Sequence, residues 1–309
     1  MSVSGAFRER AMAEITLLDG GMGQELVHRA GDKPTPLWST QIMLDHPGMV
    51  TAVHKDFFAA GATIATTNSY AIHHDRLTGT PVEGAFSALH QSALYEARTA
   101  RREHGSGQIA GAIGPLRASY RPDLHPPSEE AVALFAEVAQ LLAPACDLLM
   151  CETVASLDHA RDVLAASVPT DLPIWLAITV DDAEGSKLRS GEPVADVIPI
   201  AEDSGASAIL INCSTPEAIQ PALDALKGTK LPIGAYANGF EQITEGFLDD
   251  KPTVDSLTLR RDFTPELYAD HVMEWVASGA TIVGGCCEVS PAHIAEIAKR
   301  LRADGHTII

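Results

Sequence analysis

Short apolar runs alternate with longer mixed stretches along the whole chain. The runs that we predict to be strands are residues 15–18, 63–67, 108–113, 147–150, 174–178, 208–211, 233–236 and 281–283. Most are apolar throughout rather than at every second position. Such runs indicate strands that are buried on both faces, as in a parallel sheet covered by helices.

The stretches between the runs carry the signals of helices. At Thr215-Pro216, Thr264-Pro265 and Ser290-Pro291, a capping residue precedes a proline that fits the first helical turn. The predicted helices are residues 47–60, 82–102, 129–143, 156–166, 193–204, 216–227, 265–278 and 291–303.

Strands that alternate with helices predict a parallel sheet, and eight such units close best as a TIM barrel. An open doubly wound sheet is the alternative, but no Gly-x-Gly-x-x-Gly motif follows the first strand. We therefore expect an α/β fold with a single (βα)8 barrel domain over residues 1–309. Within it, residues 1–13 are expected to be a flexible N-terminal segment.

Composition narrows the class of protein. The chain has 309 residues, 46% of them hydrophobic, and a net charge of −19, which disfavours binding to nucleic acid or to an anionic membrane. Apolar runs stay well short of a membrane span, and residues 1–14 lack the apolar core of a signal peptide. We therefore expect a cytoplasmic protein, in which the five cysteines are free thiols or metal ligands.

Three of the cysteines lie where strands give way to helices. Cys286 and Cys287 follow Gly284-Gly285, and Cys213 follows the run 208–211. Adjacent side chains in a regular strand point to opposite faces, but a turn loosened by glycine can aim both thiols at one point. Three thiolates at two strand ends predict a tetrahedral zinc site with an open fourth position.

Other readings of the cysteines stay open. The three could be small core residues or form a redox-active vicinal disulfide. Cys146 and Cys151 sit in or beside apolar runs without a thiol partner at motif spacing, so we interpret them as core residues.

Polar residues end several other strands, and in a barrel these ends converge on one site. Asp19 or Glu152 would suit the ammonium group of an amino acid, and backbone N–H groups around Gly20-Gly21 would suit its carboxylate. We assign the catalytic role to Glu152 and Asp19. Asn68, Tyr70 and Asn212 are further expected contacts with substrate.

A zinc ion held by three thiolates has a net charge of about −1, which makes it a poor Lewis acid for splitting water. It can still keep a substrate thiol deprotonated at neutral pH. The reaction that fits is attack by this sulfur on a methyl group of a sulfonium or ammonium donor.

Several segments match one family. They are Leu18-Asp19-Gly20-Gly21-Met22-Gly23, Thr66-Thr67-Asn68-Ser69-Tyr70, Gly111-Ala112-Ile113-Gly114-Pro115, Glu152-Thr153, Ile211-Asn212-Cys213 and Gly284-Gly285-Cys286-Cys287. With them, the chain resembles the homocysteine S-methyltransferases. The resemblance implies a TIM barrel in which Cys213, Cys286 and Cys287 bind zinc. It also implies that Asp19, Gly20, Thr66 and Glu152 contact homocysteine, and that Tyr70 lies towards the methyl donor.

The chain departs from the family at two places. Residues 236–239 read Tyr-Ala-Asn-Gly where many members have Pro-Asn-Ser/Ala-Gly, and the segment 119–123 differs from the usual donor-side sequence. We predict S-methylmethionine as the donor first, with betaine-like and dimethylsulfonio compounds next, and methionine as the product. The alternatives are a non-catalytic zinc- or thiol-binding barrel and a barrel enzyme of another class that uses Asp19 and Glu152 as acid and base. The sequence leaves homo-oligomer formation open.

Overall fold

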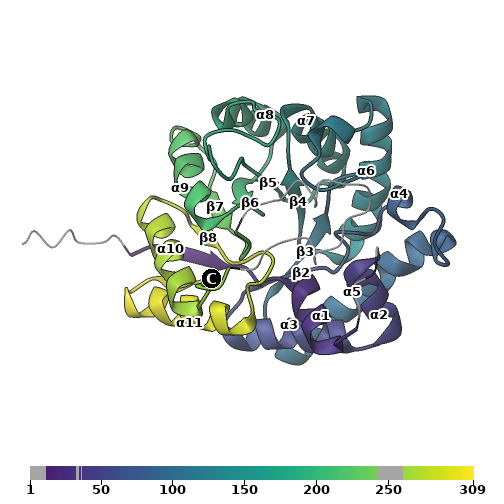
Figure 1. Cartoon of the computed structure of the whole chain (residues 1–309), viewed down its shortest axis with the longest axis horizontal. Helices are drawn as coiled ribbons and strands as arrows, with labels where there is room; N and C mark the ends of the chain where they lie inside the picture. Colours follow the sequence, from purple (N-terminus) through teal and green to yellow (C-terminus); the bar gives the residue numbers. More distant parts are fainter. Residues whose placement is uncertain (1–11, 33–34, 36, 242–259) are drawn as a thin grey trace, which may run out of the picture.

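A ring of parallel strands forms the centre of the protein, and helices surround it (Figure 1). The structure, a computed structural model, describes residues 12–32, 35, 37–241 and 260–309; most of the N-terminal segment 1–13 therefore lies outside the described residues. The strands are β1 Glu14–Leu17, β2 Ile64–Thr66, β3 Gln108–Ile113, β4 Leu148–Val154, β5 Ile174–Ile178, β6 Ala208–Asn212, β7 Ile233–Tyr236, β8 Ile282–Val283 and β9 Thr307–Ile308.

The strands pair in the order β2-β3-β4-β5-β6-β7-β8-β1-β9, and every pair is parallel. A parallel bridge between Leu18 and Ile64 joins the chain after β1 to β2, and the Thr63 N–H donates to the Leu17 carbonyl at 2.7 Å. These contacts close the ring, so the barrel prediction is confirmed. The pattern missed β9, which pairs with the start of β1 and is too short to have a period of its own.

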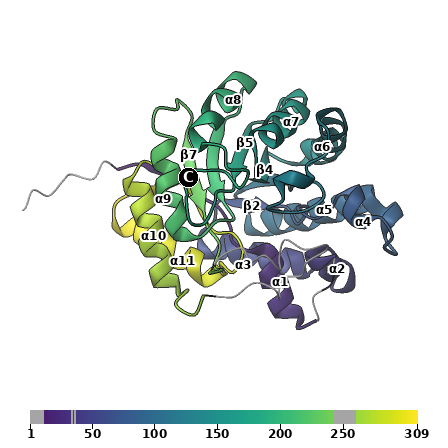
Figure 2. The same ribbon diagram turned by 45° about the horizontal axis from the view of Figure 1, so that its top comes forward.

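The helices are α1 Met22–Ala30, α2 Trp38–Asp45, α3 Met49–Ala60, α4 His74–Leu77, α5 Phe86–His104, α6 Ser128–Leu142, α7 Leu157–Ser167, α8 Val197–Ser204, α9 Pro216–Ala225, α10 Pro265–Ala277 and α11 Pro291–Ala303. Each predicted helix is present, with small shifts at its ends. We did not predict α1, α2 and α4, which are extra helices in the loops that follow β1 and β2. Figure 2 shows α1 and α2 side by side, at the lower right of the molecule.

The barrel has two hydrophobic layers. Its interior is filled by one cluster of buried side chains, made up of Leu18, Ile64, Ala110, Leu148, Met150, Ala177, Ala208, Leu210, Tyr236 and Ile282. Alternate residues of the same strands, such as Ile209 and Ile211 of β6, belong to the second cluster, between the sheet and the helices. Burial on both faces explains why the strand runs are apolar throughout.

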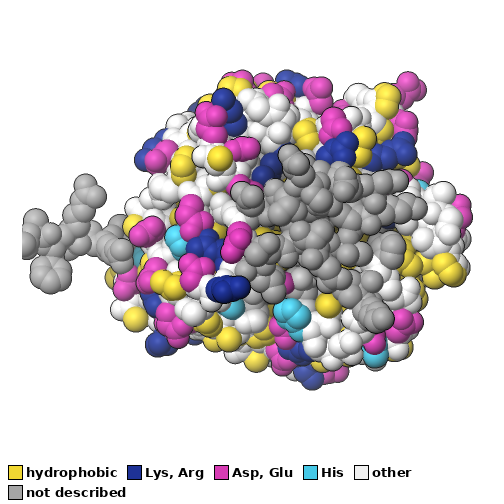
Figure 3. Space-filling model, in the orientation of Figure 1, with side chains coloured by type: hydrophobic (Ala, Val, Ile, Leu, Met, Phe, Trp, Pro, Cys, Tyr) yellow, Lys and Arg dark blue, Asp and Glu magenta, His cyan; other side chains and the backbone are white. Residues whose placement is uncertain are grey.

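The charged surface is mixed. On the face in Figure 3, acidic side chains lie scattered among basic ones rather than in one block. Of the helices in the described part of the chain, none is long and apolar enough to cross a membrane.

Candidate active site

A cavity opens at the carboxyl ends of the strands, where the catalytic residues of TIM barrels lie. Nine of the ten site residues expected from the sequence line it: Asp19, Gly20, Thr66, Asn68, Tyr70, Glu152, Cys213, Cys286 and Cys287. The tenth, Asn212, lies outside this lining.

Three thiols meet in this cavity. The sulfurs of Cys213, Cys286 and Cys287 all lie within 4.8 Å of one another, and the Cys213 and Cys286 sulfurs are 2.6 Å apart. Among the described residues, these three form the one group of His, Cys, Asp or Glu side chains able to share a metal ion. Cys151 is buried and Cys146 half-buried, both away from this group.

The turns that aim the thiols differ from our expectation. The left-handed backbone conformations fall at Cys213 (φ 48°) and Glu288 (φ 67°), not at Gly284 or Gly285. A Cβ atom on Gly285 would lie 2.0 Å from a methyl carbon of Val289, and one on Gly284 2.5 Å from the Leu18 Cβ. The glycines are therefore needed for close packing, and the left-handed turns lie at Cys213 itself and directly after Cys287.

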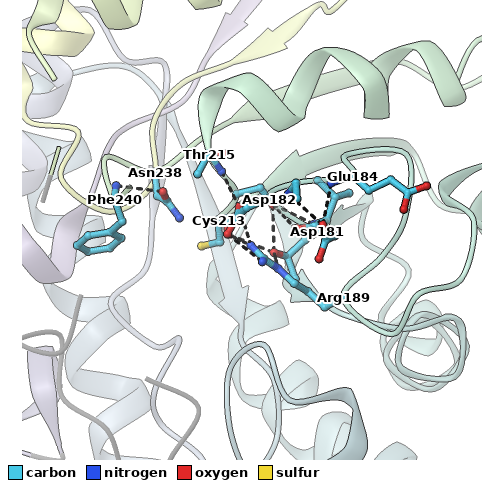
Figure 4. Close-up of polar contacts among 12 residues, drawn as sticks. Asp181, Asp182, Glu184, Arg189, Cys213, Thr215, Asn238 and Phe240 are labelled. Carbon is cyan, nitrogen blue, oxygen red and sulfur yellow. Dashed lines mark hydrogen bonds and ion pairs between the residues drawn. The ribbon is translucent and has the colours of Figure 1, made fainter. Parts of the chain in front are cut away.

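Hydrogen bonds to the Cys213 carbonyl oxygen hold the turn at this residue, on the side away from its sulfur. The Thr179 hydroxyl donates to the Cys213 carbonyl at 3.1 Å, and an Arg189 Nη donates to the same oxygen at 3.5 Å. Asp182 pairs with Arg189 and accepts the Thr215 N–H at 3.0 Å. In Figure 4 the Cys213 sulfur points away from Arg189, so the network fixes the backbone and leaves the thiol to the cavity.

The three thiols differ in acidity. Hydrogen bonds from Cys286 and Cys287 hold the pKa of Cys213 well below its usual value. Donating to Cys213 raises the pKa of Cys286 and of Cys287. Cys213 is therefore the first of the group to become a thiolate, the form that binds metals.

Asp19 is fixed against the second strand. Its two carboxylate oxygens accept from the Thr66 N–H at 2.7 Å and the Thr66 hydroxyl at 2.8 Å. Burial raises the pKa of Asp19 from 3.8 to about 7, although both bonds from Thr66 lower it. An ammonium group entering the cavity would stabilise the carboxylate and bring this pKa down.

Glu152 lies inside β4 rather than after it, which corrects the predicted end of this strand at residue 150. The pairing of β4 with β5 shifts between Cys151 and Val154, and Thr153 has a φ of 59°. At this irregularity Glu152 faces the cavity and accepts the Tyr236 hydroxyl at 3.0 Å. Burial and then the Cys213 sulfur raise the pKa of Glu152 to about 8.

Asn212 holds this irregularity in place. Its carbonyl oxygen accepts the Thr153 N–H at 3.0 Å, and its amide nitrogen donates to the Thr153 hydroxyl at 3.2 Å. Both ends of the amide are used within the protein and the residue is fully buried, so in this structure Asn212 supports the part of β4 that carries Glu152.

Two other expected contacts are partly used within the protein. The Asn68 amide donates to the Ser39 carbonyl at 3.2 Å. The Gly21 N–H donates to the Val289 carbonyl at 2.9 Å, so it is not free for a substrate carboxylate. A Cβ on Gly20 would lie 2.2 Å from that carbonyl oxygen, which explains the glycine there.

Sequence reasoning missed several residues of the cavity wall. They are Trp38, Arg76, Tyr120, Tyr236 and Phe240. Tyr236 ends β7, and the strand-end rule could have found it. The others come from loops and short helices, where periodicity says nothing about which side chains turn inward.

Comparison with known proteins identifies this arrangement. The sequence model of one family, homocysteine S-methyltransferase, matches residues 16–301, nearly the whole barrel. The chain belongs to the homocysteine S-methyltransferase family. The family resemblance drawn from the sequence is therefore confirmed, and the protein is an enzyme of this family.

Individual relatives align over almost their full length. The homocysteine S-methyltransferase of Escherichia coli K12 is 32% identical, over 93% of this chain and 95% of that protein. A selenocysteine methyltransferase from Astragalus bisulcatus is 28% identical, with 92% of each chain covered. The crystal structure of the metallated form of the E. coli enzyme MmuM has a TM-score of 0.78 at 27% identity, covering 93% of this chain and 96% of that one.

The buried carboxyl group of Asp19 is expected to destabilise this homocysteine methyltransferase at neutral and higher pH, and the effect can be measured. Asp19→Asn should raise the free energy of unfolding of the substrate-free enzyme at pH 8. Between pH 4 and 7 the folded chain holds a proton on Asp19 that the unfolded chain has released, so stability falls as the pH rises. The rise in pKa from 3.8 to about 7 corresponds to at most about 4 kcal/mol.

Urea unfolding at pH 8 and pH 5 tests this, with Asp158→Asn as the control because that carboxylate is 82% exposed. If Asp19→Asn raises the free energy of unfolding by no more at pH 8 than at pH 5, the pKa of Asp19 is not raised in the folded enzyme.

Proposed function

We propose that the enzyme transfers a methyl group from a sulfonium or ammonium donor, S-methylmethionine first, to the sulfur of homocysteine, giving methionine. Zinc is the proposed metal, held by Cys213, Cys286 and Cys287. The observation that carries the proposal is the meeting of three thiols with two buried carboxyl groups in one cavity.

The donor set suits zinc. In a tetrahedral zinc site the sulfurs lie about 2.3 Å from the metal and therefore about 3.8 Å from one another. This spacing falls between the 2.6 Å that separates the Cys213 and Cys286 sulfurs and the 4.8 Å within which all three sulfurs lie. Thiolates also favour zinc over the hard cations Mg²⁺ and Ca²⁺. When bound, zinc lowers the pKa of a coordinated substrate thiol, so that the sulfur is a thiolate at neutral pH.

The chain's own residues orient the substrates. Asp19 and Glu152 would hold the homocysteine ammonium, each as a carboxylate fixed by a hydrogen bond from Thr66 or Tyr236. The homocysteine sulfur then supplies the electron pair of the new carbon–sulfur bond. The bond from the methyl carbon to the positive sulfur or nitrogen breaks, and the leaving group takes its electron pair and becomes neutral.

Aromatic rings on the same cavity suit a positive donor. Trp38 and Tyr70 meet edge to face with ring centroids 6.4 Å apart, and both line the cavity. The Trp38 indole N–H donates to Gln24 at 3.0 Å, which fixes the ring. Onium groups are attracted to the faces of such rings.

Zinc-loaded protein should be assayed with homocysteine and a panel of methyl donors, scoring methionine and demethylated donor. Zinc binding without turnover of any donor would favour a zinc- or thiol-binding barrel. Activity that survives serine at all three cysteines would favour an acid–base enzyme using Asp19 and Glu152. Selenocysteine should be included as an acceptor, because one relative is named for it.

We also infer a cytoplasmic location, with which the free thiols agree.

A further inference from the structure

Arg76 is a cation in the wall of the cavity that the proposed reaction has not used. It belongs to the short helix α4 and lines the same cavity as the three thiols. Its guanidinium carbon lies 5.9 Å from the centroid of the Tyr70 ring, and an Nη donates weakly to the Ser119 hydroxyl at 3.4 Å. The Nε atom is buried without a hydrogen-bond partner.

The charge of Arg76 is not balanced within the described part of the chain, where no carboxylate pairs with it. The neighbouring Asp75 carboxylate instead accepts the backbone N–H groups of Arg76 and Arg117. Arg76 is half-buried, and its guanidinium is always charged, with the Nε donor buried and unused. This donor and this charge are therefore available to an anionic group of a ligand in the cavity, where a charge-assisted hydrogen bond would form.

The other titratable side chains of the cavity wall are acids, so none of them attracts an anion. Asp19, Glu152 and the three thiols line the same cavity, and among the described lining residues Arg76 is the one Lys, Arg or His side chain. The Tyr70 hydroxyl bonds to Ser119 at 2.8 Å, the same hydroxyl that Arg76 reaches. Arg76 thus lies next to the aromatic wall that suits a positive donor, and a carboxylate on that donor has one favourable position.

We propose that Arg76 binds a carboxylate of the methyl donor, so that the enzyme selects donors carrying both an onium centre and a carboxylate. This inference rests on the proposed function. It makes Arg76 a specificity-determining residue on the donor side, with the onium group against Tyr70 and the carboxylate at the guanidinium.

The test compares two donors that differ in one charge, S-methylmethionine and its methyl ester, on the zinc-loaded full chain. For wild-type enzyme, kcat/KM should be about 10- to 100-fold lower with the ester, as expected for loss of a hydrogen-bonded charge. Arg76→Gln should lower kcat/KM for S-methylmethionine by a similar factor and change the value for the ester less than about threefold. Arg76→Lys should recover part of the loss, and the KM of homocysteine should not change.

Arg117→Gln is the matched control, because Arg117 pairs with Glu130 on the surface and lies outside the cavity lining. Equal use of ester and acid by wild-type enzyme would overturn the proposal and leave the proposed function standing. So would an equal loss with both donors in Arg76→Gln, or a rise in the KM of homocysteine instead. The comparison in wild-type enzyme can overturn the proposal even if Arg76→Gln fails to fold, and Arg76→Lys is then the variant that tests the assignment to this side chain. Absence of methionine with every onium donor would remove the proposed function, and this inference with it.

Discussion

Cys286→Ser is expected to leave the enzyme without zinc and to lower methyl transfer by more than about 100-fold. Removal of an outer-shell partner of a metal ligand already costs about 10- to 100-fold, and loss of a ligand exceeds that. A serine hydroxyl stays protonated at neutral pH and is a harder ligand than thiolate, so it cannot replace the sulfur. The remaining Cys213 and Cys287 would leave two open positions and hold the metal weakly.

Metal content per chain and the initial rate of methionine formation are the two measurements. Cys146→Ser is the matched control, because Cys146 is half-buried and lies outside the group of three thiols. A Cys286→Ser protein that keeps one zinc per chain and its full rate would refute the proposed metal site.

Glu152→Gln is expected to raise the KM of homocysteine by about 30-fold or more while zinc content stays the same. The substitution keeps the shape of the side chain and its acceptor for Tyr236, and removes only the charge that would pair with the ammonium. Losing one partner of a buried charge pair costs about 2–5 kcal/mol, which is roughly 30- to 5,000-fold in binding. Glu152 is 8% exposed, so water cannot replace the lost interaction.

Two further variants serve as comparisons for the rise in the KM of homocysteine. Tyr236→Phe should cost only about tenfold, because it removes one hydrogen bond and leaves the charge. Glu184→Gln should have no effect, since Glu184 is exposed and pairs with Lys187. If the KM of homocysteine is the same in Glu152→Gln and wild-type enzyme, Glu152 does not bind the ammonium group.

The sequence was sufficient for the barrel and for most of the residues at its mouth. Unbroken apolar runs such as Ile209–Ile211 predict strands that are buried on both faces. Such a run can be recognised from a few neighbouring residues, without knowledge of the rest of the fold. The carboxyl ends of parallel strands meet at one edge of a barrel. The positions of Asp19 and Cys213 therefore followed from chain order alone.

Tertiary structure decided which way the side chains face and what they contact. The irregularity in β4 that turns Glu152 to Tyr236 is held by Asn212, which lies 59 residues after its partner Thr153 in the chain. The raised pKa values of Asp19 and Glu152 come mainly from desolvation by the surrounding fold. The contacts of Arg76 with the Tyr70 ring and with the Ser119 hydroxyl, 43 residues further along the chain, bring it to the cavity wall. Such long-range contacts leave no periodic pattern in the sequence, so they could be found only in the folded protein.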